Sequence, residues 1–385
     1  MPDRNSEIPS LDAQLKSPGF VVDVISERFE SPVGASTRPL GNDSRDARDE
    51  VTAIIRSGEW QFENVACLCG GTRFRVVSFR DRFGIPDPVS ICRECGLVLA
   101  NPRLRSEDYS RFYQSWYRRI YGGCSPEVLF DRQRGKGFVL RAWLAEHGIH
   151  LAPGDLVLEI GTGAGGILDA FRETGQEVMG CDFDEKFLQY GRDRGIPLVF
   201  GDASQLPHRG RARLAIVCHV FEHLPDPVRE LSIFRSLLRP DGLLLIEVPG
   251  IDHEVGPYRP TGHKPYDFLD YQQGAHTYHF DRRSLERVVT SSGYSIVAID
   301  DKITALLTPA SSDGTSKTPP SPAAAANDAS QPVLEKLRRL EQRRKKSLWF
   351  YSWAFPLAET LYSLVRITAR RLGVVKILRK KRSRM

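Results

Sequence analysis

The middle of this 385-residue chain carries a glycine-rich loop directly after an apolar run. Residues 156–160 read LVLEI, and Gly161, Gly163 and Gly166 follow. Glycines where a strand turns into a helix allow the backbone to approach a ligand closely, and the free N–H groups at the helix start attract polar or anionic groups. Dinucleotide-binding loops have the same spacing, so the loop predicts a binding site but leaves its ligand open.

Acidic and polar side chains follow the next apolar runs, at the point where each run ends. Asp182 lies 21 positions after Gly161, where a carboxylate can accept hydrogen bonds from both hydroxyls of a ribose. Asp202 follows the third run, and His219 follows the fourth. Ligands of open α/β sheets bind outside the carboxyl ends of the strands, so we expect these side chains to converge with Glu159 on one crevice.

Four of the seven cysteines form two pairs, Cys67 with Cys69 and Cys92 with Cys95, and a glycine follows each pair. Four thiolates in two such turns are typical of a closed, tetrahedral, structural zinc site. The first pair is one residue shorter than the usual CxxC, so free buried cysteines or a site that has lost its metal stay open as alternatives.

An odd number of cysteines does not indicate a disulfide scaffold, and residues 1–10 contain no apolar signal segment, so we expect a cytoplasmic protein.

Strands and helices must alternate to position these residues. The strand candidates after residue 155 are continuous apolar runs, which indicates a parallel sheet buried on both faces. We therefore predict an α/β fold, a Rossmann-like sheet with helices on both faces, in which residues 303–308 return as an antiparallel edge strand. The predicted strands are 156–160, 177–181, 198–200, 213–218, 243–248 and 295–299, and the predicted helices include 107–118, 128–147, 185–194, 227–238 and 283–292.

Composition divides the chain into further parts. Residues 309–331 are rich in Pro, Ser and Ala and poor in large apolar residues, which is typical of a flexible linker. The predicted parts are a poorly ordered leader (1–60), a zinc ribbon (61–105), connecting helices (106–150), the α/β domain (151–308), a flexible linker (309–332) and a basic amphipathic helical tail (333–385).

The formal net charge of +6 is an average over two unlike regions. Residues 333–385 contain 16 basic and 3 acidic residues, so the remainder of the chain is slightly acidic. Aromatic residues beside dense Lys and Arg suit the headgroup region of an anionic membrane, and we expect the tail to bind such a surface at the inner face of the membrane. The alternative is a helix that packs on the protein itself or on a dimer partner.

Five motifs in order make the interpretation more specific. The segments VLEIGTGAG, CDFDEKFL, GDAS, CHVFEHLPDP and LRPDGLLLIEVP resemble successive motifs of the class I S-adenosylmethionine-dependent methyltransferases, over residues 151–299. A nicotinamide-dependent dehydrogenase would explain the glycine loop and Asp182 but not the later motifs. The resemblance implies that Gly161, Thr162, Gly163 and Gly165 pass the methionine part of the cofactor, that Glu159 reaches its charged end, that Asp182 holds the ribose, and that Asp202 and Ala203 read the adenine edge.

The cysteine pairs, followed by Asn101-Pro102-Arg103, resemble the zinc-ribbon module found ahead of a methyltransferase domain in bacterial enzymes that modify sugars and polysaccharide precursors. This resemblance implies a sugar, polysaccharide or lipid-linked envelope precursor as methyl acceptor. An RNA acceptor is the rival interpretation, because arginines alternate with phenylalanines in residues 73–83 and aromatic residues beside cations can stack bases. Because the body outside the tail is slightly acidic, nucleic acid is the less favoured partner. A non-catalytic binding protein with the same fold is a third alternative.

Methyl transfer requires that the acceptor be aligned with the methyl group and, often, that a proton be removed from it. The candidate bases are His219, His223, His276 and His279, and the last two lie in a segment rich in His, Tyr and Gly that we expect to cover the substrate. Each histidine is equally compatible with a structural hydrogen bond. Glu222 with His223 could also hold a divalent metal, a weaker alternative because no further ligands at diagnostic spacing accompany them.

Overall fold

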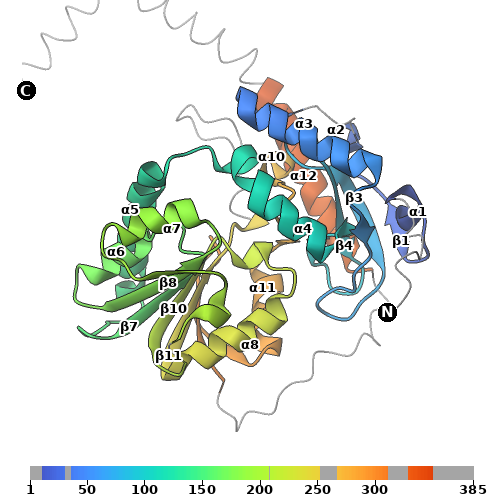
Figure 1. Cartoon of the computed structure of the whole chain (residues 1–385). Coiled ribbons are helices and arrows are strands. Elements are labelled where there is room, and N and C mark those ends of the chain that lie inside the picture. Colours follow the sequence, from blue (N-terminus) through green and yellow to red (C-terminus); the bar gives the residue numbers. More distant parts are fainter. Residues whose placement is uncertain (1–10, 31–35, 208, 252–266, 311–327, 350–385) are drawn as a thin grey trace, which may run out of the picture.

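The described part of the protein, in a computed structural model, contains two large sheets that lie next to each other, besides one two-stranded sheet (Figure 1). The structure describes residues 11–30, 36–207, 209–251, 267–310 and 328–349. A seven-stranded sheet has the order β13-β14-β11-β10-β7-β8-β9, and a five-stranded sheet has the order β1-β3-β4-β5-β12. The second sheet is built from the N-terminal part of the chain, except for its last strand.

The seven-stranded sheet has helices on both faces. Buried residues of α5, α6 and α7 form one cluster with alternate side chains of the strands, and α8 and α11 form a second cluster with the intervening side chains. This confirms the predicted α/β fold. The strands are β7 (Leu156–Ile160), β8 (Glu177–Asp182), β9 (Leu198–Phe200), β10 (Ala212–Cys218), β11 (Leu238–Glu247), β13 (Tyr294–Ile299) and β14 (Thr304–Pro309), and the helices are α5 (Pro126–Glu146), α6 (Gly166–Arg172), α7 (Glu185–Arg192), α8 (Pro227–Leu237) and α11 (Arg282–Ser291).

Strand β14 is antiparallel, as expected, but it does not lie at the edge of the sheet. It pairs with β11 through Leu244 and Leu307 and with β13 through Ile296 and Leu307. The insertion buries Leu306 and Leu307 completely. An apolar strand is stabilised more between two neighbours than at an exposed edge, because both of its faces and both of its hydrogen-bonding sides are then satisfied.

The five-stranded sheet extends beyond the predicted ribbon at both ends. Its strands are β1 (Phe20–Val22), β3 (Phe74–Arg80), β4 (Pro86–Cys92), β5 (Val98–Ala100) and β12 (Tyr278–His279), and β2 (Phe62–Glu63) pairs separately with β6 (Arg103–Leu104). Strand β12 comes from the segment between β11 and α11, far along the chain, and pairs with β5 through Tyr278 and Leu99. The segment between β11 and α11 therefore contributes a strand to the five-stranded sheet, so the predicted boundaries do not separate the parts of the chain that form the two sheets.

The region predicted as a poorly ordered leader contains a regular helix, α3 (Asn42–Ser57), besides the short helices α1 (Leu11–Leu15) and α2 (Glu27–Glu30). Helix α3 buries Ala47 and Val51, which lie one turn apart, and ends at Gly58 in the left-handed conformation. It packs on η1 (Tyr113–Gly122), a π-helix that continues α4 (Ser106–Phe112). The expectation of poor order was wrong for residues 42–57. It was based on the turn-forming residues nearby and not on the short helical pattern of apolar residues in this segment.

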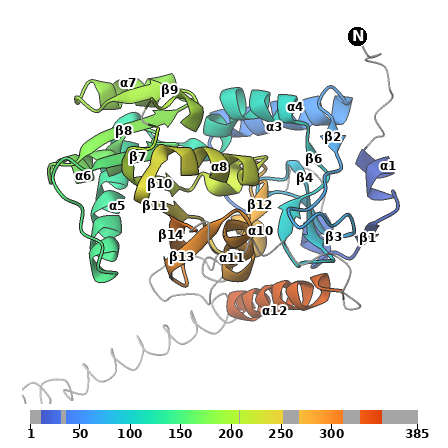
Figure 2. The same cartoon turned by 90° about the horizontal axis from the view of Figure 1, so that it is seen from below.

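Helix α12 (Ser330–Trp349) begins inside the predicted linker and lies along the five-stranded sheet (Figure 2). Leu334 and Leu337 are fully buried there, in a cluster with Phe29 and Val77. Asp328, just before the helix, pairs at 2.8 Å with both Arg75 and Arg93. The apolar face that we expected to meet a membrane is therefore packed against the protein, as in the alternative considered above.

Residues 350–385 of the predicted tail lie outside the described residues. Among the helices of the described residues, none is long and apolar enough to cross a membrane.

Truncation of Leu337 should release α12 from the sheet. We expect Leu337→Ala to lower the free energy of unfolding by about 3 kcal/mol, because a buried leucine side chain is lost and a cavity remains. Chemical denaturation of the full chain measures this change. The control is Glu335→Ala in the same helix, where the side chain is exposed, and equal stability of the two variants would contradict the packing of α12.

Candidate active site and metal centre

The glycine loop after β7 has the backbone conformation that only glycine adopts readily. Gly161, Gly163 and Gly165 have φ angles of 71°, 54° and 81°. A Cβ atom on Gly161 would lie 2.2 Å from a methyl carbon of Val220, in the turn after β10. The loop and that turn are therefore in contact, which brings the ends of β7 and β10 together at one edge of the sheet.

Glu159 lies directly beneath this loop and is 1% exposed. Its Oε2 accepts a hydrogen bond of 2.7 Å from the hydroxyl of Thr162. Burial raises the pKa of Glu159 to about 8, although the Thr162 hydrogen bond opposes this shift. The carboxyl group is therefore largely protonated at neutral pH in the ligand-free protein, and a cationic ligand group would favour its ionisation.

Asp182, at the end of β8, is held next to the glycine loop. Its carboxylate accepts hydrogen bonds from the N–H groups of Gly163 at 2.8 Å and Asp184 at 2.9 Å. Burial raises the pKa of Asp182, and Arg118, whose guanidinium lies 4.0 Å away, opposes the shift. The structure thus brings Glu159, the glycine loop and Asp182 together, as the sequence predicted for a crevice at the strand ends.

Asp202 and Ala203 follow β9, the next strand along this edge, and begin the short helix η2 (Ala203–Gln205). The carboxylate of Asp202 is exposed and accepts hydrogen bonds from the N–H and hydroxyl groups of Ser204. The side chain of Ala203 is fully buried in the core. These two residues lie at the predicted edge, where a ligand would meet the Asp202 carboxylate and the backbone of Ala203.

A pocket of about 320 Å³ opens beside this crevice, where the two sheets meet. Its lining comes from the N-terminal part, from η1, from the turn after β10 and from the segment that leads to β12. His219, which directly follows β10, lines the pocket, so the pocket reaches the edge of the sheet where the cofactor crevice is predicted. The lining residues are Arg38, Arg82, Tyr117, His219, Glu222, His223, Pro249, Asp270, Tyr271, Gln273 and His276.

His219 lies between two glutamates. Its Nε2 is 3.3 Å from Glu247, and its Nδ1 is 3.8 Å from Glu222. Burial would lower the pKa of His219, but hydrogen bonds to Glu222 and Glu247 outweigh it and raise the pKa to about 10. Lys136 of α5 also binds Glu247, at 2.6 Å. Sequence reasoning missed Glu247 and Lys136; Glu247 stands in the motif LIEVP, whereas no sequence pattern marks Lys136.

Glu222, His223 and His276 form a buried polar cluster on the pocket wall, and we refer to these three residues as the pocket triad. The first two belong to η3 (Phe221–His223), and His276 follows α10 (Phe268–Tyr271) and precedes β12. Glu222 Oε1 lies 3.7 Å from His223 Nε2 and 4.0 Å from His276 Nε2. Burial lowers the pKa of both histidines, so both imidazoles are neutral near pH 7.

His279, which the sequence also predicted as a base, does not line the pocket. It is fully buried and lies behind His276, with its ring packed against Phe268 and Tyr271. Burial lowers the pKa of His279 to about 3. Its place in β12, paired with Val98, fixes the side chain in the interior, so the role of His279 as the base stays a prediction that this placement does not support.

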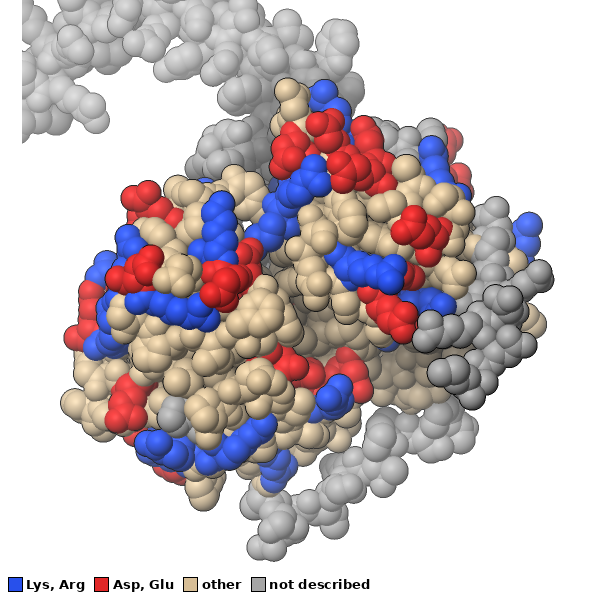
Figure 3. Space-filling model, viewed as in Figure 1, with Lys and Arg blue, Asp and Glu red and all other residues tan. Residues whose placement is uncertain are grey.

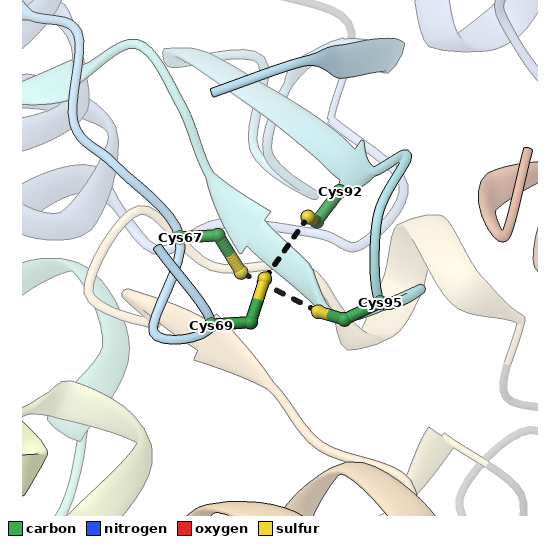
Figure 4. A group of neighbouring side chains, drawn as sticks. All are labelled: Cys67, Cys69, Cys92 and Cys95. Atoms are coloured by element: carbon green, nitrogen blue, oxygen red, sulfur yellow. Dashed lines mark hydrogen bonds between the residues drawn. The ribbon is translucent and has the colours of Figure 1, made fainter. Parts of the chain in front are cut away.

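The four cysteines Cys67, Cys69, Cys92 and Cys95 converge on one point (Figure 4). The sulfur atoms of Cys67 and Cys95 are 3.5 Å apart, and those of Cys69 and Cys92 are 3.7 Å apart. Ligands at a zinc–sulfur distance of about 2.3 Å in a tetrahedron are separated by about 3.8 Å, so this donor set fits zinc. The short CxC spacing does not prevent the convergence, because Cys69 turns back through Gly70, which has a φ of 82°.

Loss of one thiolate should abolish metal retention. We expect about one zinc per chain in the wild-type protein and substantially less in Cys92→Ser, since three thiolates no longer close the site. Elemental analysis of the purified proteins checks this. Cys124→Ser, a cysteine outside the cluster, serves as control. A wild-type protein that is stable without any bound metal would contradict the zinc assignment.

Comparison with known proteins agrees with this architecture. Residues 132–299 match the family model described as a methyltransferase domain. The C-methyltransferase NovU from Streptomyces niveus is 31% identical over 35% of this chain and 36% of its own length, and a probable S-adenosylmethionine-dependent methyltransferase from Mycolicibacterium smegmatis is 26% identical over 51% and 63%.

The chain thus spans between about a third and two thirds of these curated relatives. Among solved structures, 1,6-didemethyltoxoflavin-N1-methyltransferase from Burkholderia thailandensis is 21% identical over 55% of this chain and 93% of its own, with a TM-score of 0.40. The family match coincides with the glycine loop, Asp182 and the parallel sheet, and residues 132–299 are therefore similar to a methyltransferase domain.

Proposed function

We propose that the whole chain transfers a methyl group from S-adenosylmethionine to a small hydrophilic molecule bound in the pocket between the two sheets. One observation carries this proposal. The turn after β10 borders both sites, because Val220 packs against Gly161 of the glycine loop while His219 and Glu222 line the pocket. An acceptor in the pocket would therefore lie next to the predicted position of the cofactor.

The cofactor supplies a methyl group already activated on a sulfonium, so the protein has to position the acceptor and manage its proton. Neutral imidazoles of His223 and His276, with Glu222 beside them, are suited to hold or remove that proton. His219, protonated between two glutamates, is suited to interact with negative charge that develops on the acceptor.

The lining of the pocket supports a sugar-like acceptor. Guanidinium, carboxylate and amide groups line the pocket, and such groups recognise hydroxyl-rich molecules. They belong to Arg38, Arg82, Asp270 and Gln273. We propose a sugar, polysaccharide or lipid-linked envelope precursor, in keeping with the resemblance of the cysteine module. NovU is a C-methyltransferase by name, so carbon is one of the acceptor atoms that this proposal includes.

The arginines that suggested RNA binding have partners within the protein. Arg73 pairs with Glu94, Arg75 with Asp23 and Asp328, and Arg80 donates to the carbonyl of Arg28. On the face shown in Figure 3, basic and acidic side chains are interspersed. Both observations favour a small acceptor over RNA, since a nucleic acid needs accessible and clustered cations.

A contact with an anionic membrane surface is a proposal for the C-terminal region alone. It rests on the basic and aromatic composition of residues 350–385. In the described part of that region, α12 uses its apolar face for packing, so only its exposed basic side chains, such as Arg339 and Lys346, could meet such a surface.

Cofactor binding should strengthen with pH if Glu159 pairs with the charged end of the methionine part. Because the pKa of Glu159 in the free protein is about 8, the carboxylate form is scarce at pH 6.5 and prevails at pH 8.5. We expect calorimetric titration with S-adenosylhomocysteine to show roughly 25-fold tighter binding at the higher pH. Glu159→Gln should bind more weakly and lose this pH dependence, while Glu177→Gln, an exposed glutamate, should keep it. The same pH profile in all three proteins would refute the role of Glu159.

Substitutions in the pocket triad should abolish methyl transfer without weakening cofactor binding. We expect Glu222→Gln and His276→Gln to lower methyl transfer by a factor of about 100 or more. Affinity for S-adenosylhomocysteine should change less than about threefold, because neither residue belongs to the glycine loop or to β8. The assay uses labelled S-adenosylmethionine and a panel of nucleotide sugars, lipid-linked glycans and RNA. His147→Gln, an exposed histidine outside the pocket, is the matched control, and full activity in the Glu222 and His276 variants would disprove the assignment.

A further inference from the structure

We propose that Glu222, His223 and His276, the pocket triad, bind a divalent transition-metal cation that faces the acceptor pocket. The role of the cation rests on the proposed function, because it would hold an oxygen atom of the acceptor. The site itself rests on the geometry of the three side chains. Each offers one ligand atom, and these atoms lie within 4.8 Å of one another.

The hydrogen bond of His223 leaves a nitrogen free for a metal. Its Nδ1 lies 2.8 Å from the carbonyl oxygen of Ala275. A carbonyl oxygen can only accept, so the proton is on Nδ1, and Nε2 keeps its lone pair. That lone pair faces Glu222 Oε1 at 3.7 Å. A histidine whose second nitrogen donates to a backbone carbonyl is the usual arrangement of a metal ligand, because the hydrogen bond fixes both tautomer and ring orientation.

Two further polar atoms of the triad have no hydrogen-bond partner. These are Glu222 Oε2 and His276 Nδ1, in side chains that are 1% and 4% exposed. A buried carboxylate oxygen without a partner costs free energy that a cation bound to Glu222 would recover, whereas His276 Nδ1 points away from Nε2, the nitrogen that faces Glu222, and would not contact that cation. The amide nitrogen of Gln273 also approaches His276 Nε2, and it would have to rotate away when a cation binds.

The charge balance separates the triad from the neighbouring group of Cys218, His219 and Glu247, whose side chains also lie close together. In that group the carboxylate is already neutralised by Lys136 at 2.6 Å, and it accepts a further hydrogen bond from Thr304 at 3.3 Å. Among the described residues, Glu222 has ion-pair contacts with imidazoles alone. The carboxylate of Glu222 thus has no Lys or Arg partner among the described residues, and its contact with the protonated His219, at 3.8 Å, is shared with Glu247.

The donor types indicate which cations fit. Two imidazoles and one carboxylate suit Mn²⁺, Fe²⁺, Co²⁺ or Zn²⁺ better than Ca²⁺, which prefers oxygen ligands alone. Three protein ligands leave coordination positions open toward the 320 Å³ pocket. A cation there would bind an acceptor oxygen and stabilise negative charge on it. In the metal-loaded protein the cation would thereby take over the management of the acceptor proton from the coordinated imidazoles, which is a different role from that of the closed cysteine site.

Titration with Mn²⁺ tests the site, because thiolates of the cysteine cluster select softer metals than Mn²⁺. The zinc-loaded full-length protein is titrated, and electron paramagnetic resonance measures the Mn²⁺ that stays free. We expect one Mn²⁺ per wild-type chain and at least tenfold weaker binding in Glu222→Gln and in His276→Ala. Glu247→Gln is the matched control, since it removes the carboxylate of the neighbouring group and should change the affinity less than threefold.

A second measurement needs no variant and therefore does not depend on variant folding. Pulsed electron paramagnetic resonance of the wild-type Mn²⁺ complex should detect coupling to imidazole nitrogens. Any one of three results would overturn the inference: no Mn²⁺ binding to the wild type, no coupling to imidazole nitrogens, or equal Mn²⁺ affinity in all variants. If Mn²⁺ does not bind and the triad variants still lose methyl transfer, the inferred metal site is wrong and the proposed function stands. If Mn²⁺ binds as expected but no acceptor is methylated, the metal site stands and the proposed function is wrong.

Discussion

The pairing of β12 with β5 is the constraint on which the rest of the site depends. A segment between β11 and α11 leaves the seven-stranded sheet and adds two residues, Tyr278 and His279, to the edge of the N-terminal sheet. Backbone hydrogen bonds at a sheet edge fix the register, and the register decides which side chains face inward. His279 is thereby placed in the interior, and His276, three residues earlier, reaches the pocket opposite Glu222.

This pairing also explains why the pocket has walls from both ends of the chain. Tyr109 of α4 donates a hydrogen bond from its hydroxyl to the carbonyl oxygen of Ala275, and Tyr121 of η1 accepts one from the N–H of Gly274. The aromatic rings of Tyr113 and Tyr117 pack edge-on against His223. The connecting helices therefore act as part of the site, since they hold the segment before β12 against the turn after β10.

The distribution of charge follows from the same junction. Glu247, Lys136 and His219 form one charged group after β10 and β11, while Glu222 lies in a more enclosed place between the neutral imidazoles of His223 and His276 and the charged His219. Two carboxylates a short distance apart thus have different surroundings, which is how proteins assign different tasks to chemically identical groups. Helix α12 supports the arrangement from outside, because Arg344 near its end pairs with Asp267, next to the pocket residue Asp270 on α10.

The sequence by itself determined the parts that depend on local pattern. Each of these parts is recognisable within a few residues, because backbone conformation and strand burial restrict the residue types at those positions. They are the apolar strands, the glycine loop, Asp182 and the two cysteine pairs. Only the tertiary structure decided which histidines meet the pocket, that Glu247 and Lys136 belong to the site, and that α12 packs on the protein. These outcomes depend on contacts between segments more than a hundred residues apart, such as Lys136 with Glu247 or Asp328 with Arg75. No local periodicity encodes such contacts, since they arise from the pairing and packing of whole elements.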